Sequence, residues 1–161
     1  MQPEIQKHLN KHNITYEHFT HIGIFTAKES EEHTSHLPGI RCKNIFLKDR
    51  DSKTYYLVTL PVTKIINMKS LQKHVGAKKL TLANEEELKS ILNSSPGHVS
   101  PFGIFYDKER KAKYIIEKSV WESPTGANFH PGINTESIHV DHENFHKLIN
   151  SFEREYDILE V

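Results

Sequence analysis

The chain has 161 residues, of which 36% are hydrophobic and 26% charged, as expected for one globular domain. Its 21 basic and 21 acidic side chains cancel, which argues against a protein that holds nucleic acid mainly through phosphates. The single cysteine, Cys42, excludes an intramolecular disulfide. No apolar run approaches the roughly 20 residues of a membrane span, and the polar N-terminus does not resemble a signal peptide. We therefore expect a cytoplasmic protein without membrane contact.

The first third of the chain predicts two helices and a β-hairpin. Apolar residues spaced i, i+4 behind Pro3 indicate a short helix, and residues 14–20 have the composition of a strand. The sequence TAKE at 26–29 has the form of a capping box, so we expect a second helix to begin there. Two strands, at 42–49 and 54–60, flank the polar stretch RDSK and predict a hairpin.

Two further helices are predicted around a short strand in the middle of the chain. Asn67 can cap the first of them, and Gly76 provides its C-terminal stop. The strand is LTLA at 80–83. Asn84 can cap the second helix, whose first turn holds three glutamates where the helix dipole favours acids.

The last third predicts an ordered loop, a second hairpin and a final helix. The loop is the Pro- and Gly-punctuated segment 94–101. Apolar runs at 103–106 and 113–117 flank DKER and predict the hairpin. A strand follows at 134–140, Asp141 can cap the last helix, and the final five residues predict a closing strand.

Consecutive hairpins with interspersed helices predict an α+β fold on a mixed, mostly antiparallel sheet. Regular βαβ units are missing, so a doubly wound sheet is excluded. No repeat, low-complexity segment or linker interrupts the pattern. We expect residues 1–161 to form a single domain.

Common catalytic and cofactor motifs are absent from the sequence. It contains no P-loop, G-x-G-x-x-G, G-x-S-x-G or H-E-x-x-H motif. His8 and His12 have a spacing that could hold a metal, but no third ligand lies near them in sequence. We therefore expect neither a metal nor an organic cofactor, and the chemistry must come from less familiar segments.

The first such segment surrounds Lys43 on the strand at 42–49. Alternation along a strand places Lys43 on one face with Ile45 and Leu47. A lysine among apolar neighbours is explained if its ammonium borders a cleft, where it could hold a phosphate or an ester oxygen. The alternative is a strand lysine that extends its end to solvent.

The second segment is the loop formed by Gly97, His98, Val99, Ser100 and Pro101. Glycine permits conformations closed to other residues, and proline stiffens the exit from the loop. Backbone groups between them could bind an amino group through carbonyls and orient a water through amides. The alternative is an ordinary helix-to-strand connection.

The third segment is NFHP at 128–131, which is followed by Asn134 and Thr135. His130 is a candidate general base or hydrogen-bond partner, and Asn134 can pair with ligand hydroxyls or with nearby backbone. A histidine before proline can also be purely structural.

Together and in this order, the segments resemble the YbaK-like family of aminoacyl-tRNA editing domains. The resemblance is strongest to its free-standing prolyl-tRNA editing proteins and covers nearly the whole chain. The matching stretches are LPGIRCKNIFLKD at 37–49, VGAKKLTLANEEEL at 75–88, SPGHVSPFGIF at 95–105 and NFHPGINTESI at 128–138.

The resemblance implies a strongly curved mixed sheet and a deacylase that removes alanine from mischarged tRNA(Pro). It implies that Lys43 is the catalytic lysine, followed by Asn44 as in the alanine-specific branch. It places substrate at the 97–101 loop, His130 and Asn134. Charged tRNA(Pro) is the implied partner, and docking onto prolyl-tRNA synthetase stays open.

The substrate, the enzymatic nature of the domain and the composition of its pocket stay open at this level. The substrate could instead be tRNA charged with cysteine, serine or threonine, and a non-catalytic aminoacyl-tRNA-binding module is the alternative outside enzymes. Two departures from the family pattern, Gly132 and Glu136, are expected near the pocket. Its walls are expected among four apolar residues, namely Ile24, Phe25, Ile45 and Phe46.

Overall fold

The protein is described by a computed structural model of residues 1–161, apart from the side chain of Ala27. Its helices are α1 (Pro3–Lys11), α2 (Ala27–Thr34), α3 (Met68–Val75), α4 (Glu85–Leu92), the 3₁₀ helix η1 (Pro101–Phe105), α5 (Lys118–Trp121) and α6 (His142–Ser151). Its strands are β1 (Glu17–Thr20), β2 (Ile40–Asp49), β3 (Tyr55–Pro61), β4 (Leu80–Leu82), β5 (Ala112–Glu117), β6 (Ala127–Phe129), β7 (Glu136–Val140) and β8 (Tyr156–Leu159).

The eight strands form one sheet with the order β1-β7-β6-β2-β3-β5-β8, and β4 pairs separately with β2. The pairs β1–β7, β6–β7, β2–β3 and β2–β4 are antiparallel, whereas β2–β6, β3–β5 and β5–β8 are parallel. The predicted α+β fold with a mixed, mostly antiparallel sheet is confirmed. The long strand β2 joins the two halves of the sheet because its first residues pair with β6 and its later ones with β4.

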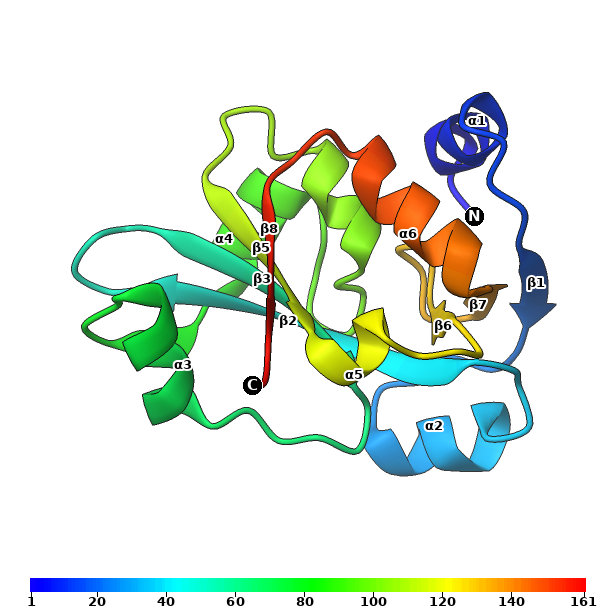
Figure 1. The fold of residues 1–161 in the computed structure, drawn as a ribbon, viewed down its shortest axis with the longest axis horizontal. Helices are drawn as coiled ribbons and strands as arrows, with labels where there is room; N and C mark the ends of the chain where they lie inside the picture. Colours follow the sequence, from blue (N-terminus) through cyan, green and yellow to red (C-terminus); the bar gives the residue numbers. More distant parts are fainter.

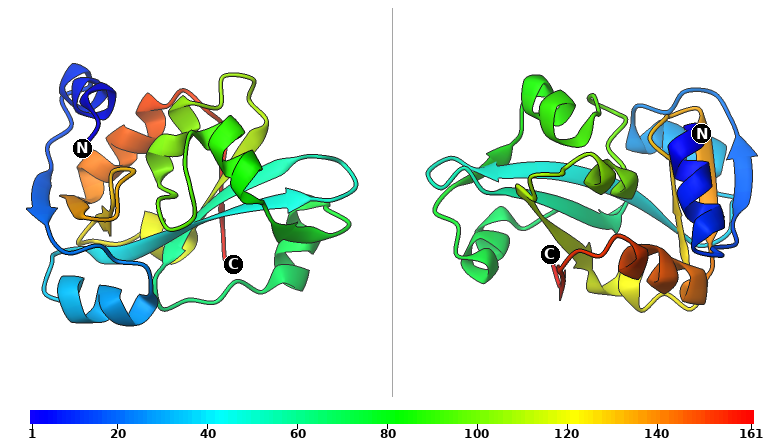
Figure 2. Two further views of the ribbon diagram at one scale, coloured as in Figure 1. Left: turned by 180° about the vertical axis from the view of Figure 1, so that it is seen from behind. Right: turned by 90° about the horizontal axis from the view of Figure 1, so that it is seen from above.

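Helices cover the sheet on both sides (Figures 1 and 2). In the view of Figure 1, α1, α4 and α6 lie above the long β2–β3 ribbon, and α2 and α3 lie below it. The larger hydrophobic core includes residues of α1, α4, η1 and α6, whereas a smaller one includes Leu71 of α3. Within the part of the chain that the structure describes, no helix is long and apolar enough to cross a membrane.

The predicted helix caps are confirmed at all four positions. The side chains of Thr26, Asn67, Asn84 and Asp141 each accept a hydrogen bond from a backbone N–H in the first helical turn. Capping residues satisfy donors that have no partner within the helix, so these starts are set by local chemistry. Gly76 ends α3 with a φ of 70°, as its C-terminal position predicts.

The predicted second hairpin is wrong. Residues 101–105 form η1, and β5 pairs in parallel with β3 instead of folding back on the preceding segment. A short apolar run reads alike in a buried helix and a buried strand, and Phe102, Gly103 and Ile104 are all buried. The sequence also gave no indication of α5 or β6, which are only four and three residues long.

Candidate functional site

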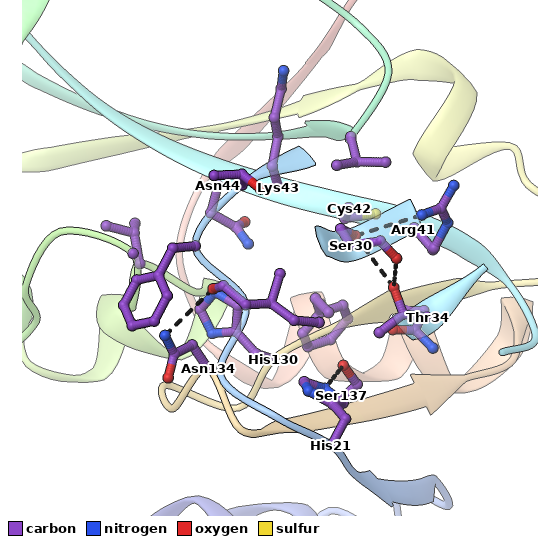
Figure 3. Close-up of a pocket in the computed structure, with 18 residues that line it drawn as sticks. His21, Ser30, Thr34, Arg41, Cys42, Lys43, Asn44, His130, Asn134 and Ser137 are labelled. Atoms are coloured by element: carbon purple, nitrogen blue, oxygen red, sulfur yellow. Dashed lines mark hydrogen bonds between the residues drawn. The ribbon is translucent and has the colours of Figure 1, made fainter. Parts of the chain in front are cut away.

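A cleft of about 240 Å³ lies where four separate segments of the chain meet (Figure 3). Strand β2 forms one wall, and α2 with the loop before it forms another. The remaining border comes from the 97–101 loop and from β6 with the turn that follows it. The lining residues lie within these four segments, at 21–34, 41–44, 97 and 99, and 128–137, and Val62 adds one further side chain.

Six of the nine residues that the sequence singled out lie at this cleft. They are Lys43, Asn44, Gly97, Val99, His130 and Asn134. The cleft thus unites the strand, loop and FHP segments, which are up to about 90 residues apart in the chain.

The other three candidates, all in the 97–101 loop, support its shape. The His98 ring lies 3.0 Å from the Ser95 hydroxyl, on the side away from the cleft. Ser100 caps η1 by accepting the Phe102 N–H at 3.2 Å, and Pro101 is buried as the first residue of η1. None of these three residues is part of the cleft lining.

Lys43 borders the cleft. Figure 3 draws no hydrogen bond from Lys43 to the other residues of the cleft, and partial burial lowers its pKa. Figure 3 shows its side chain extending away from His130, whereas Asn44 points toward His130. The alternation along β2 thus places a cation on one side of the strand and an amide on the other.

The Asn44 amide is oriented by a buried chain of hydroxyl groups. Asn44 lies opposite Thr59 in the β2–β3 register, and the Thr59 hydroxyl donates to Asn44 Oδ1 at 2.6 Å. The Tyr114 hydroxyl lies 2.9 Å from Thr59 Oγ1. Because the single Thr59 proton goes to Asn44, Tyr114 must donate to Thr59. The carbonyl of Asn44 is thus occupied from behind, and its NH₂ group is the end left for the cleft.

Two buried polar atoms at this cleft have no partner. Within the described residues, only Asn44 Nδ2 and His130 Nδ1 are buried side-chain nitrogens or oxygens without a hydrogen bond. A buried group left unsatisfied costs roughly 1–3 kcal/mol. Both exceptions border the same cavity, which indicates that the cavity is built to receive a polar ligand.

His130 is uncharged at neutral pH. Its burial, together with the nearby His98 and His21, lowers its pKa to about 4. A neutral imidazole carries one proton, so it offers one donor and one acceptor rather than a positive charge. It can therefore hydrogen-bond a ligand without attracting an anion.

Asn134 and His21 hold the loop that precedes α2. The Asn134 side-chain NH₂ donates to the Ile24 carbonyl at 3.3 Å, and the Asn134 backbone carbonyl accepts the Ile24 N–H at 3.1 Å. The His21 Nδ1 lies 2.7 Å from the Ile22 carbonyl, and its Nε2 lies 2.9 Å from the Ser137 hydroxyl. The Asn134 side chain thus has a structural partner, and residues 21–24 are fixed against the 134–137 segment.

A family model described as the aminoacyl-tRNA editing domain matches residues 21–148, which include all four segments of the cleft. The chain belongs to this family.

Curated relatives of this editing domain span most of its length. The chain is 27% identical over 153 residues to the prolyl-tRNA editing protein ProX of Acetoanaerobium sticklandii. The aligned region covers 95% of this chain and 93% of the relative. It is 30% identical to the prolyl-tRNA synthetase associated domain-containing protein 1 of Mus musculus, covering 90% and 87% of the two chains. The homologous protein of Bos taurus is 32% identical, with 78% and 74% covered.

Solved structures confirm the fold of the editing domain. One described as a candidate trans-editing enzyme for prolyl tRNA synthetase has a TM-score of 0.72 at 15% identity, covering 100% of this chain and 99% of the other. A hypothetical protein of known structure also reaches 0.72 at 13% identity, covering 96% and 97%.

Several features of this editing domain differ from the expectations from sequence. Ile24 and Phe25 line the cleft, but Ile45 and Phe46 do not, because their side chains pack in the two hydrophobic cores. Gly132 and Glu136 also lie outside the cleft lining, and Glu136 instead bonds the Met1 amine and His18. Ile45 and Phe46 are therefore not wall residues, whereas Gly132 and Glu136 lie within two residues of the lining residues His130, Asn134 and Ser137.

The structure adds cleft residues that the sequence did not indicate. His21, Arg41 and Ser137 all line the editing cleft, and Arg41 forms an ion pair with Glu31 of α2. Nothing in their local sequence distinguishes these residues. They come together only because β1 pairs with β7 and β2 pairs with β6. Burial raises the pKa of the Cys42 thiol to about 12, so this cleft residue is not a thiolate nucleophile at neutral pH.

Among the described residues, no group of three or more His, Cys, Asp or Glu side chains could hold a metal ion. The editing cleft also contains the Lys43 ammonium, the oriented Asn44 amide, the neutral His130 imidazole and the backbone groups of its loops.

Proposed function

We propose that this editing domain, acting as one unit over residues 1–161, is a trans-acting deacylase that hydrolyses alanine from mischarged tRNA(Pro). The observation that carries the proposal is the pair of unpartnered polar atoms, on Asn44 and His130, in the cleft of an aminoacyl-tRNA editing domain. The names of its relatives, which refer to prolyl-tRNA editing and prolyl-tRNA synthetase, support tRNA(Pro) as the carrier.

The reaction is attack of water on the carbonyl carbon of the aminoacyl ester. The ester C–O bond breaks, the proton from water passes to the departing ribose oxygen, and alanine and uncharged tRNA are released. The ester is already activated, so no covalent protein nucleophile is required. The free neighbouring hydroxyl of the terminal ribose can help position the water.

Each cleft group has a role in this proposal. Lys43 holds the terminal nucleotide through a phosphate or ester oxygen, since its ammonium borders the cleft with no partner among the cleft residues. The Asn44 NH₂ group donates to the carbonyl oxygen on which negative charge develops. Backbone groups of the 97–101 loop hold the aminoacyl part, and neutral His130 and Asn134 border the substrate.

Selectivity for alanine would come from the size of the cleft. Ile24, Val99 and Phe129 are apolar residues of its wall. A small pocket can exclude the proline ring by steric clash, whereas preference for a slightly larger apolar group yields only about 1–3 kcal/mol. A second sieve of this kind would remove the alanine that a synthetase fails to reject.

The test is deacylation of tRNA(Pro) charged separately with alanine, cysteine and proline, with the wild type, Lys43→Ala, Lys43→Arg and the exposed control Lys113→Ala. We expect loss of alanine alone. We expect kcat/KM to fall by about 10²- to 10³-fold in Lys43→Ala, as for the loss of one preorganised electrostatic contact at a reacting group. Lys113→Ala should match the wild type, and Lys43→Arg should retain part of the activity.

Other results would redirect the proposal. Release of cysteine, or of serine or threonine from their own tRNAs, would retain the deacylase and change its substrate. No release from any charged tRNA by folded protein would contradict the enzyme and favour a non-catalytic aminoacyl-tRNA-binding module. Sedimentation of the protein with prolyl-tRNA synthetase, with and without tRNA(Pro), would test docking onto the synthetase.

A further inference from the structure

Phe25 is an unusual aromatic residue because most of its surface is in solvent. Phe25 is 69% exposed, whereas the other described Phe, Tyr and Trp residues are all buried or half-buried. It nevertheless borders the cleft. An exposed ring at the border of a functional site is more informative than an isolated exposed aliphatic residue, because aromatic surface is typical of recognition sites.

The Phe25 ring rests on two glycines. A Cβ atom added to Gly97 would lie 3.4 Å from Phe25 Cδ1, and one added to Gly23 would lie 3.3 Å from Cε2. The ring thus lies close to both backbones, which bear no side chain that would separate them. Gly97 has a φ of +80°, so backbone conformation and ring contact both favour glycine there.

The backbone that carries Phe25 is held from both sides. Its N–H donates at 2.8 Å to Glu29 Oε2, the carboxylate that also completes the capping box of α2. The preceding residue, Ile24, exchanges two hydrogen bonds with Asn134. Because this backbone is already held, little backbone entropy is lost when a ligand covers the ring.

The size of the cleft limits what its interior can hold. Its volume of about 240 Å³ is below the roughly 300–1,000 Å³ typical of sites that enclose a drug-sized ligand. An aminoacyl group and part of its ribose can enter, but the base attached to that ribose must lie near the border. The exposed face of Phe25 is available there.

We propose that Phe25, seated on Gly23 and Gly97, is a stacking platform for the terminal adenine of charged tRNA. The inference rests on the proposed function and adds a nucleobase subsite to it. Stacking suits a chain of zero net charge, because it supplies affinity that does not depend on phosphate contacts. Phe25 then recognises the carrier of the amino acid, and the amino acid itself is selected deeper in the cleft.

The test compares Phe25→Ala, Phe25→Leu and Phe25→Trp with the wild type on alanyl-tRNA(Pro). Base stacking on an aromatic ring is worth about 1–3 kcal/mol, which corresponds to a factor of about 5 to 150. We expect kcat/KM to fall by such a factor in Phe25→Ala, mainly through a higher KM. Phe25→Leu should be nearly as impaired, because it restores apolar bulk without a π face, and Phe25→Trp should recover the activity.

A matched pair of small substrates isolates the base. Alanyl-adenosine and the alanyl ester of methyl riboside share the ester and the ribose hydroxyls and differ only in the adenine. The wild type should prefer alanyl-adenosine, and Phe25→Ala should lose that preference, so that it hydrolyses the two esters with similar kcat/KM.

The outcomes separate this inference from the function on which it rests. If the wild type deacylates no charged tRNA, the proposed function itself fails. If it is active but Phe25→Leu equals the wild type, the ring acts only as apolar packing and the inference is overturned. A change in the ratio of alanine to proline release in Phe25→Ala, with KM unaltered, would also overturn it, because Phe25 would then be a wall of the amino acid pocket.

Discussion

At the scale of single residues, the orientation of the Asn44 amide depends on groups that cannot touch a substrate. Thr59 and Tyr114 are buried, with exposed fractions of 0% and 1%. Their hydroxyls form a directed chain that ends on Asn44 Oδ1. If the chain is broken, the amide can rotate, and its NH₂ group is no longer held toward the cleft.

Thr59→Val tests this chain because it replaces the hydroxyl by a methyl group of similar size. We expect kcat on alanyl-tRNA(Pro) to fall at least several-fold with KM nearly unchanged. The free energy of unfolding should also fall, by roughly 1–3 kcal/mol for the partners left unsatisfied. Thr59→Ser keeps the hydroxyl and should restore kcat. Equal kcat values in the Val and Ser variants would show that the chain has no positioning role.

His130 links the cleft to the stability of the protein at low pH. Burial lowers its pKa to about 4 in the folded protein, from the ordinary histidine value of 6.5. Between these values the unfolded chain binds a proton that the folded chain does not, so the free energy of unfolding falls as the pH falls. The contribution of His130 amounts to about 2 kcal/mol between pH 7 and pH 5.

This contribution is measured by urea denaturation at pH 7 and pH 5. His130→Gln should lose less stability on acidification than the wild type, by about that amount. The matched control is His74→Gln, which makes the same substitution at an exposed histidine on α3. If the unfolding free energy of His130→Gln falls with pH as steeply as that of the wild type, His130 is not held neutral in the folded protein.

At the scale of elements, two glycines of similar backbone conformation differ in what surrounds them. Gly76 ends α3 with a φ of +70°, and nothing lies within 4 Å of an added Cβ. Gly126 precedes β6 with a φ of +76°, and an added Cβ would lie 2.0 Å from the Val140 carbonyl oxygen. The second glycine allows β6 to approach β7, and β6 leads directly to His130.

We expect Gly76→Ala to cost about 1 kcal/mol of unfolding free energy, because only the left-handed conformation opposes it. Gly126→Ala should cost more than about 3 kcal/mol, because backbone must also move. It should lower deacylation by displacing β6, whereas Gly76→Ala should not. Thermal or urea unfolding of the two variants measures the difference, and equal costs would contradict the close approach of the strands.

At the scale of the whole molecule, one buried ion pair fixes the C-terminal strand to the rest of the sheet. Arg154 donates to Asp107 Oδ2 at 2.7 Å and to the backbone carbonyls of Asp107 and Ala112. The arginine side chain is 10% exposed and the aspartate 1%. These contacts join the segment before β8 to the start of β5, with which β8 pairs in parallel.

Arg154→Met should lower the free energy of unfolding by about 3–5 kcal/mol, because it leaves the Asp107 carboxylate buried without its cation. Adding Asp107→Asn should recover part of this loss, since the uncompensated charge is then removed. Urea denaturation of the two variants provides the measurement. A loss below about 1 kcal/mol in Arg154→Met, as for an exposed ion pair, would contradict this role.

The sequence by itself determined the local starts and stops of the helices and the family of the protein. Thr26, Asn67, Asn84 and Asp141 could be identified as caps because a cap bonds backbone only two or three residues away. Lys43 and Asn44 could be identified because their neighbours match a family pattern. Such signals lie within a few residues of the feature they predict.

Only the tertiary structure decided which residues share the cleft. Phe25 meets Gly97, Thr59 meets Tyr114, and His21 meets Ser137, each across a separation that no periodicity encodes. It also decided that residues 101–105 form a 3₁₀ helix, since a buried apolar run fits either secondary structure until its neighbours are known. The physical reason is that local hydrogen bonding determines where elements begin, whereas strand pairing and burial determine which of them come together.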